Sequence, residues 1–204
     1  MKTDLELLAA WRDDDASAGG ELFRRYFDPL FRFFVNKVPD DAEDLIQNTL
    51  MACVRYGDKV GQASSFRAYL FTMARNELYR FLRSKKPHGE IDFGVSSLVD
   101  LAPSPSTVLG SAERERQLLG ALRSLPVDAQ LILELHYWED LSTAELAEIL
   151  EMPQGTAKSR IRRAKQLLQT ALRRGTDPTE TDALERWVRS MRDKVATARE
   201  LSPS

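Results

Sequence analysis

Apolar residues that recur every three or four positions are the feature of this sequence that most constrains its fold. The clearest run comprises Phe23, Tyr26, Phe27, Leu30, Phe31 and Phe34. Such spacing places side chains on one face of an α-helix. Pro29 lies inside the run and predicts a kink. No segment shows a convincing alternation typical of a half-buried β-strand, so we predict an all-α protein.

Two further helices are predicted in the first part of the chain. The segment "DDAEDLIQNTLMACV" predicts a helix with Asp40 as its N-cap and Glu43 three residues later. Its inward face is predicted to comprise Ala42, Leu45, Ile46, Thr49, Leu50 and Cys53. After the break "YGDKVGQASS", residues 66–84 predict another long helix. These helices can share one core, which predicts a first domain over residues 1–84.

The composition changes after residue 84. Residues 85–106 contain prolines, glycines and serines without helical periodicity, which indicates a flexible linker. Periodicity returns over 107–175, the predicted second domain. There Ser142 and Glu145 match a capping box, and "EMPQG" supplies a turn before a basic segment. Two short helices joined by such a turn are typical of a helix-turn-helix.

The basic segment "GTAKSRIRRAKQLLQTALRR", residues 155–174, contains seven lysines and arginines and no acid, although the net charge of the chain is only −2. A merely solvated helix normally mixes charges to form pairs four residues apart. Near the start of this helix, Lys158, Ser159, Arg162, Arg163 and Lys165 fall largely outside the apolar face. This pattern favours entry into the major groove of DNA over a solvated face.

A polar stripe with basic and aromatic residues lies on the helix predicted over residues 66–84. It comprises Thr72, Arg75, Asn76, Tyr79, Arg80 and Arg83. Arginines beside an aromatic ring suit nucleic acid with unstacked bases, because rings stack on bases and arginine neutralises phosphate. A core aromatic flanked by solvated arginines explains this stripe equally well by itself. The second basic helix in the other half of the chain favours nucleic acid.

An acidic patch is formed by Asp41, Glu43, Asp44, Gln47 and Asn48. Carboxylates near a helix start are stabilised by the helix dipole, and this is the simpler explanation of the patch. An exposed acidic face would repel DNA phosphate and would suit a protein partner that carries basic residues.

No catalytic or metal-binding set is recognisable. Cys53 is the single cysteine and is predicted to be a small, reduced core residue, while His88 and His136 lack metal-ligand spacing. No nucleophile with a base, no paired catalytic carboxylates and no phosphate-cradling loop can be assembled. We therefore expect no enzymatic activity, no catalytic residue, no metal and no cofactor.

The chain is expected to be cytoplasmic, without membrane insertion. No run approaches the roughly 18 apolar residues of a membrane span. The start "MKTDLELLAAWRDDD" turns acidic where a signal peptide would need an apolar core.

Four segments resemble, in order, the signatures of the extracytoplasmic-function (ECF) sigma factors of bacteria. They are "DAEDLIQNTL", "SSFRAYLFTMARNELYRFLR", "LRSLPVDAQLILELHYWEDLSTAELAEIL" and "MPQGTAKSRIRRAKQLL". The resemblance extends over about residues 3–174, and four motifs in family order are more specific than any one of them. It implies two helical domains, regions two and four, which recruit core RNA polymerase to a promoter.

The resemblance also implies three binding surfaces. The clamp helices of the largest polymerase subunit would bind Asp41, Glu43, Asp44, Gln47 and Asn48. The minus-ten element, opened with a non-template base flipped from the stack, would be recognised by Gln62, Ser64, Ser65, Arg67, Arg75, Asn76, Tyr79 and Arg80. The duplex minus-thirty-five element would be read by Thr156, Lys158, Ser159, Arg162, Arg163 and Lys165. The flap of the second-largest subunit is a further implied contact, and the family makes an anti-sigma factor plausible as a partner.

The sequence departs from the family pattern in three places. Tyr69 stands where many relatives carry tryptophan, and Ala157 where valine is usual. Residues 176–204 form an extension that the family plan does not require. An amphipathic helix is predicted there from Leu184, Trp187, Val188, Met191 and Val195. A regulatory helix and a frayed tail are both open explanations of it.

Two other classes of function remain open. A stand-alone helix-turn-helix activator or repressor would use the same basic helix, but it would leave the acidic patch and the basic-aromatic stripe without a role. A protein that sequesters polymerase could keep the first domain and lose promoter reading.

Overall fold

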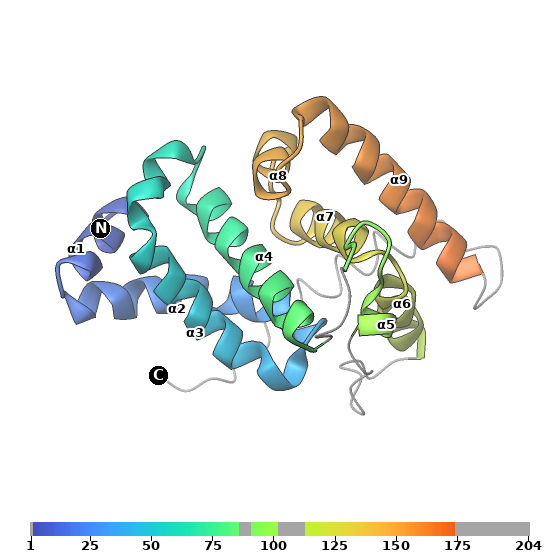
Figure 1. Ribbon diagram of the computed structural model, residues 1–204, viewed down its shortest axis with the longest axis horizontal. Helices are drawn as coiled ribbons and strands as arrows, with labels where there is room; N and C mark the ends of the chain where they lie inside the picture. Colours follow the sequence, from blue (N-terminus) through green and yellow to red (C-terminus); the bar gives the residue numbers. More distant parts are fainter. Residues whose placement is uncertain (1, 86–90, 102–112, 174–204) are drawn as a thin grey trace. The chain divides into compact units, whose positions relative to one another are not determined.

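The computed structural model describes residues 2–85, 91–101 and 113–173, and it confirms the all-α prediction (Figure 1). The helices are α1 (Asp4–Arg12), α2 (Ala16–Val35), η1 (Pro39–Asp41), α3 (Ala42–Arg55), η2 (Gly57–Gln62), α4 (Phe66–Lys85), α5 (Leu98–Leu101), α6 (Glu113–Arg123), α7 (Val127–Tyr137), α8 (Thr143–Ile149) and α9 (Gln154–Arg173). Within these ranges the β-pairing is limited to an isolated bridge between Ser97 and Pro126.

The chain divides into two compact units. The first comprises residues 1–90 together with 143–157, and the second comprises 91–142 together with 158–204. The helix α8 thus groups with the N-terminal helices, because it packs against α4. The sequence predicts α8, by contrast, within the second domain of residues 107–175. The predicted helix of residues 176–204 lies outside the described residues.

The core of the first unit lies between α1, α2, α3 and α4. Phe34, Leu30 and Ile46 are fully buried, and Phe33 packs edge-on against Phe34 with ring centroids 4.9 Å apart. Phe33 also lies 5.7 Å from the ring of Phe71 on α4. Aromatic side chains bury large apolar areas, so this cluster contributes much of the stability of the unit.

Helix α2 continues through Pro29 and buries only part of the predicted apolar stripe. Tyr26 lies in the core, whereas Phe23 and Phe31 are 42% and 36% exposed. The hydroxyl of Tyr26 donates to Asp4 at 2.5 Å, which joins α2 to α1. Burial and this hydrogen bond raise the pKa of Tyr26 above its usual range, so the phenol stays protonated at neutral pH.

The predicted start of α3 is wrong by about one residue. Residues Pro39–Asp41 form a 3₁₀ turn, and Asp41 then stands at the N-cap of α3 without a side-chain hydrogen bond. Pro39 favours this turn because its ring fixes φ near the helical value and its missing N–H leaves no donor unsatisfied at a helix start. Asp40 is therefore inside the turn and is not the N-cap.

Cys53 is a reduced residue of the core, as the sequence predicts. Its side chain is fully buried, and burial raises the pKa of its thiol to about 12. The hydroxyl of Tyr69 donates to the backbone carbonyl of Cys53 at 3.1 Å. Tyr69, which stands where many relatives carry tryptophan, therefore satisfies its buried hydroxyl with a hydrogen bond that joins α4 to α3.

The second unit contains an ordered segment where the sequence predicts a flexible linker. The amides of Val127 and Asp128, at the start of α7, donate to the carbonyls of Ser96 and Phe93 at 3.0 and 3.1 Å. The apolar side chains of Phe93, Leu98 and Leu101 are buried. These hydrogen bonds and buried side chains hold residues 91–101 in place. The composition of the segment does not predict them, because they depend on residues distant in sequence. No helix in the part of the chain that the structure describes is long and apolar enough to cross a membrane.

We expect Gly19→Ala to destabilise the first unit, because an added Cβ would lie 2.6 Å from the indole of Trp11. Overpacking of this kind typically costs about 1–3 kcal/mol of unfolding free energy. The neighbouring Gly20→Ala is the matched control. The nearest atom to its added Cβ is 3.8 Å away, so alanine should stabilise the helix by up to about 1 kcal/mol. Urea denaturation measures both, and equal effects of the two substitutions would contradict this expectation.

Candidate nucleic-acid interface

The acidic patch forms an exposed face of α3. Glu43, Asp44, Gln47 and Asn48 are exposed, and Asp41 is half-buried beside Lys85 at 4.0 Å. Leu45, Ile46 and Leu50 are buried on the other side of the same helix and anchor it in the core. The helix therefore presents its polar groups to solvent while its buried apolar side chains hold it in the core. Such a face is suited to a basic protein partner.

The polar stripe of α4 is more enclosed than the sequence suggests. Asn76 and Arg80 are exposed, and Arg67 and Tyr79 are half-buried, but Arg75 is only 5% exposed. The guanidinium of Arg75 lies 5.6 Å from the ring centroid of Tyr79 and donates to Oδ1 of Asn76 at 2.8 Å. On the opposite face Phe66, Leu70 and Leu78 are buried and Met73 is half-buried. The stripe therefore brings the predicted basic and aromatic groups together.

The serines before α4 contact α8. The backbone N–H of Ser64 donates to the two carboxylate oxygens of Glu148 at 3.0 and 3.3 Å. The hydroxyl of Ser65 donates to Glu145 at 2.8 Å. The side chain of Gln62, which belongs to the same predicted set, lies outside the described part.

Arg75 is enclosed by the end of α8. Its guanidinium donates to the backbone carbonyl of Ile149 and to the carboxylate of Glu151, in addition to Asn76. From the sequence, Glu145 is predicted only to form a capping box with Ser142, and Glu148 and Glu151 have no predicted role. No local signal distinguishes them from ordinary solvated helix residues, because their contacts are with residues about 75 to 85 positions away.

Helix α9 carries the expected division between an apolar and a basic face. Ala157, Ile161, Ala164 and Leu168 are buried. Lys158, Ser159, Arg162 and Arg163 are exposed, and Thr156 is half-buried. Lys165 differs from the others, because it is half-buried and its ammonium lies 5.0 Å from the ring centroid of Tyr137 on α7. A cation over a ring is held by the ring quadrupole, so Lys165 is the least free of the predicted bases on α9.

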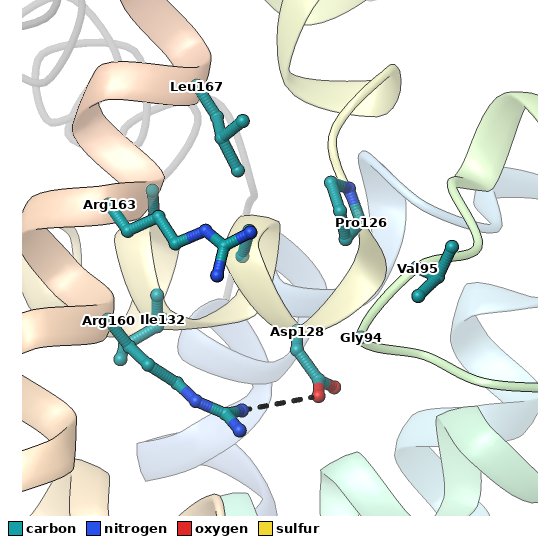
Figure 2. A pocket seen from close by; sticks show the side chains of 10 residues that line it. Gly94, Val95, Pro126, Asp128, Ile132, Arg160, Arg163 and Leu167 are labelled. Atoms are coloured by element: carbon teal, nitrogen blue, oxygen red, sulfur yellow. Dashed lines mark ion pairs between the residues drawn. The ribbon is translucent and has the colours of Figure 1, made fainter.

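A pocket of about 370 Å³ lies in the second unit beside α9 (Figure 2). Its apolar walls include Val95, Ile132 and Leu167. Figure 2 shows Arg160 and Arg163 extending from α9 toward the α7 side of the pocket, and the drawn ion pair joins Arg160 to Asp128 at 3.7 Å. Arg160, a base near the start of α9 outside the predicted set, therefore forms its ion pair within the second unit. The described residues contain no group of three or more His, Cys, Asp or Glu side chains that could hold a metal ion.

Two family models match the two halves of the chain. The model described as Sigma-70 region 2 matches residues 22–88, which include most of α2 and all of α3 and α4. The model described as Sigma-70, region 4 matches residues 115–168, which include α7, α8 and most of α9. These matches define a sigma factor of the sigma-70 type, a class of transcription regulators.

Curated relatives specify the family further. The ECF RNA polymerase sigma factor SigL of Mycobacterium tuberculosis is 30% identical over 165 residues, which span 77% of this chain and 92% of the relative. The ECF RNA polymerase sigma-E factor of Haemophilus influenzae is 25% identical over 180 residues, which span 83% and 95%. The chain belongs to the ECF sigma factors, and its role is in promoter-specific initiation of transcription by RNA polymerase. The predicted family membership is confirmed.

A solved structure is similar as well. The sigma factor RpoE of Bartonella quintana, crystallised with the anti-sigma factor NepR, is 26% identical and matches with a TM-score of 0.54. The match covers 76% of this chain and 96% of that one.

Proposed function

We propose that this sigma factor binds core RNA polymerase with the acidic face of α3, recognises the minus-ten element with α4, and reads the minus-thirty-five element with α9. The main support for assigning polymerase and DNA to different helices is that opposite charges are exposed on separate helices. Acidic groups are exposed on α3 and basic groups on α9. A basic polymerase surface and the DNA phosphates would then each meet a complementary face.

We assign recognition of the minus-thirty-five element to the first turns of α9. Four of its six predicted residues are exposed there, while buried alanines, Ile161 and Leu168 fix the helix from the other side. Arginine pairs with the major-groove edge of guanine through two hydrogen bonds. Arg162 and Arg163 are the residues that we expect to make such contacts, and Lys158 and Ser159 suit the adjacent phosphates.

The minus-ten recognition relies on the basic-aromatic stripe of α4. Arg67, Asn76, Tyr79 and Arg80 have side chains that are exposed or half-buried. A half-buried ring can stack on a base that has left the duplex, and the neighbouring arginines can neutralise phosphates. Ser64, Ser65 and Gln62 precede the helix and would line the same surface. Binding energy of this kind would trap bases as they unstack, while the polymerase performs the chemistry.

Two protein partners complete the proposal. The flap of the second-largest polymerase subunit is the partner proposed for the second unit. An anti-sigma factor is proposed as an inhibitory partner, supported by the similar RpoE structure that contains NepR.

Run-off transcription with core polymerase tests the proposed function. The templates are genomic fragments that include the region upstream of the gene for this protein. We expect a discrete transcript that depends on the protein and falls about 5- to 150-fold with Arg163→Ala, because a bidentate arginine–guanine contact contributes about 1–3 kcal/mol. Arg173→Ala is the matched control, since Arg173 is also exposed on α9 but lies outside the predicted set. An unchanged transcript with Arg163→Ala would remove α9 from promoter reading as proposed.

A further inference from the structure

We propose that the C-terminal segment, residues 176–204, binds in the pocket beside α9 through Trp187 and thereby covers Arg163. This inference rests on the proposed function of α9, because Arg163 is one of the two residues expected to read guanine in the minus-thirty-five element. While the segment is bound, this arginine is closed to DNA. The chain therefore limits its own promoter binding with a part that the family plan does not require.

The pocket offers an apolar surface that the described residues leave open to solvent. Val95 and Leu167 line it and are 74% and 36% exposed, while Ile132 contributes a buried wall. Figure 2 shows Leu167 and Arg163 on α9, with Val95 on the other side of the pocket. The volume of about 370 Å³ lies within the range of pockets that enclose small ligands, so one large side chain fits.

A tryptophan suits the combination of apolar walls and a guanidinium. Trp187 is the single aromatic residue among residues 176–204. Aromatic rings bury large apolar areas, and tryptophan is the best ring for a stacked arginine. Arg160 is already paired with Asp128 at 3.7 Å, whereas Arg163 forms no ion pair within the described residues. Arg163 is therefore the arginine of this wall that we assign to the indole.

The segment also complements the pocket in charge and periodicity. Between Arg174 and Arg186 the chain carries four acids and no base, namely Asp177, Glu180, Asp182 and Glu185. These acids suit the basic surface of α9. Trp187 belongs to the apolar face of the helix predicted over residues 184–195. A helix of about 12 residues is marginal alone in water, so it is stabilised by burying that face on a partner surface.

The connection is long enough for this docking. Arg163 and Leu167 lie about 15 and 9 Å of helix before Arg173, the last residue of α9. Residues 174–183 span up to about 33 Å when extended, so the segment can turn back along α9 and reach the pocket. A short tether raises the effective concentration to about the millimolar range, and even a weak contact is then well populated.

Fluorescence of a bimane label tests the docking in the full chain, because tryptophan quenches bimane on contact. The label is attached to Val95→Cys at the rim of the pocket, and the native Cys53 is fully buried. We expect the fluorescence to rise when Trp187→Phe removes the quencher. A label on Phe23→Cys is the control, since Phe23 is an exposed aromatic residue of α2. A rise confined to the Phe23 position, or no rise at either, overturns the proposal.

Affinity for duplex DNA tests the masking of Arg163. The probe is a fluorescent duplex of random sequence, about two helical turns long, and binding is measured by anisotropy without polymerase. An arginine contributes a phosphate contact even where no guanine is in place. We expect Trp187→Ala to bind at least about threefold more tightly than the unmodified protein, because the binding-competent fraction rises when the segment is released.

Ser190→Ala is the matched control for Trp187→Ala. It also leaves the net charge unchanged, and Ser190 falls outside the apolar face of the predicted helix. This control should bind the duplex like the unmodified protein. Equal affinities of the two variants would overturn the masking of Arg163.

The same measurements separate this inference from the proposed function, because the bimane signal involves no DNA. If Trp187 quenches the label at Val95 while Arg163→Ala leaves the run-off transcript unchanged, the docking stands and the proposed function of α9 fails. If the transcript depends on Arg163 while Trp187→Phe leaves the fluorescence unchanged, the proposed function stands and this inference fails.

Discussion

Asp44→Lys is expected to abolish binding to core RNA polymerase and, with it, the transcript. Asp44 is exposed on the outer face of α3, and a lysine there would meet the basic partner surface with like charge. Juxtaposed like charges at an interface cost several kcal/mol, which corresponds to a loss of affinity of about 100-fold or more. A cation near the start of a helix costs only about 0.3–1 kcal/mol of stability. Affinity measurements with core polymerase and urea denaturation separate the two effects.

Asp13→Lys is the control for this substitution, because Asp13 is exposed, lies at the end of α1 and changes the net charge by the same amount. A lysine at a helix C-terminus is electrostatically favourable, so stability should not fall. We expect this control to bind polymerase like the unmodified protein. If Asp44→Lys does the same, α3 is not the polymerase surface.

Phe71→Ala is expected to have the largest effect on stability. Phe71 is completely buried in α4 and packs on Phe33 at 5.7 Å between ring centroids. Truncation of a buried phenylalanine costs about 3–5 kcal/mol, through lost burial and the cavity that remains. A domain has only about 5–15 kcal/mol in total, so the first unit should be close to unfolding at 37 °C. Urea denaturation followed by circular dichroism measures the loss.

Phe31→Ala is the control for Phe71→Ala. It tests whether the loss of stability comes from the burial of the ring or from removing any aromatic residue. Phe31 stacks on Phe27 at 5.7 Å but is 36% exposed on α2. Because much of its surface already contacts solvent, its truncation should cost well under half of the value for Phe71. Equal losses for the two substitutions would contradict the assignment of the core.

Local periodicity predicts the helical fold and most of the faces of its helices. The spacing of apolar residues assigns Ile161 and Leu168 to the buried side of α9 and leaves Arg162 and Arg163 outside, as the structure has them. The reason is that side-chain direction in a helix depends only on position along the chain.

Predictions that depended on how much of a helix face is covered, or on contacts distant in sequence, were less accurate. The six-residue apolar stripe of α2 is too wide for the core, so Phe23 and Phe31 remain partly exposed while Phe33, on a neighbouring face, is buried. The predicted linker contains the folded residues 91–101, because their hydrogen-bonding partners lie some thirty residues further along.

The sequence by itself determined most helices of this protein, its family and the positions of its acidic and basic faces, because periodicity and charge are local properties and motif order can be read directly along the chain. The tertiary structure alone decided which of these groups are accessible. Arg75 reads in the sequence as an exposed base on a polar stripe, yet it is buried by Ile149 and Glu151. Its exposure depends on the packing of α8 against α4, and contacts between residues so distant in sequence are set by the fold as a whole.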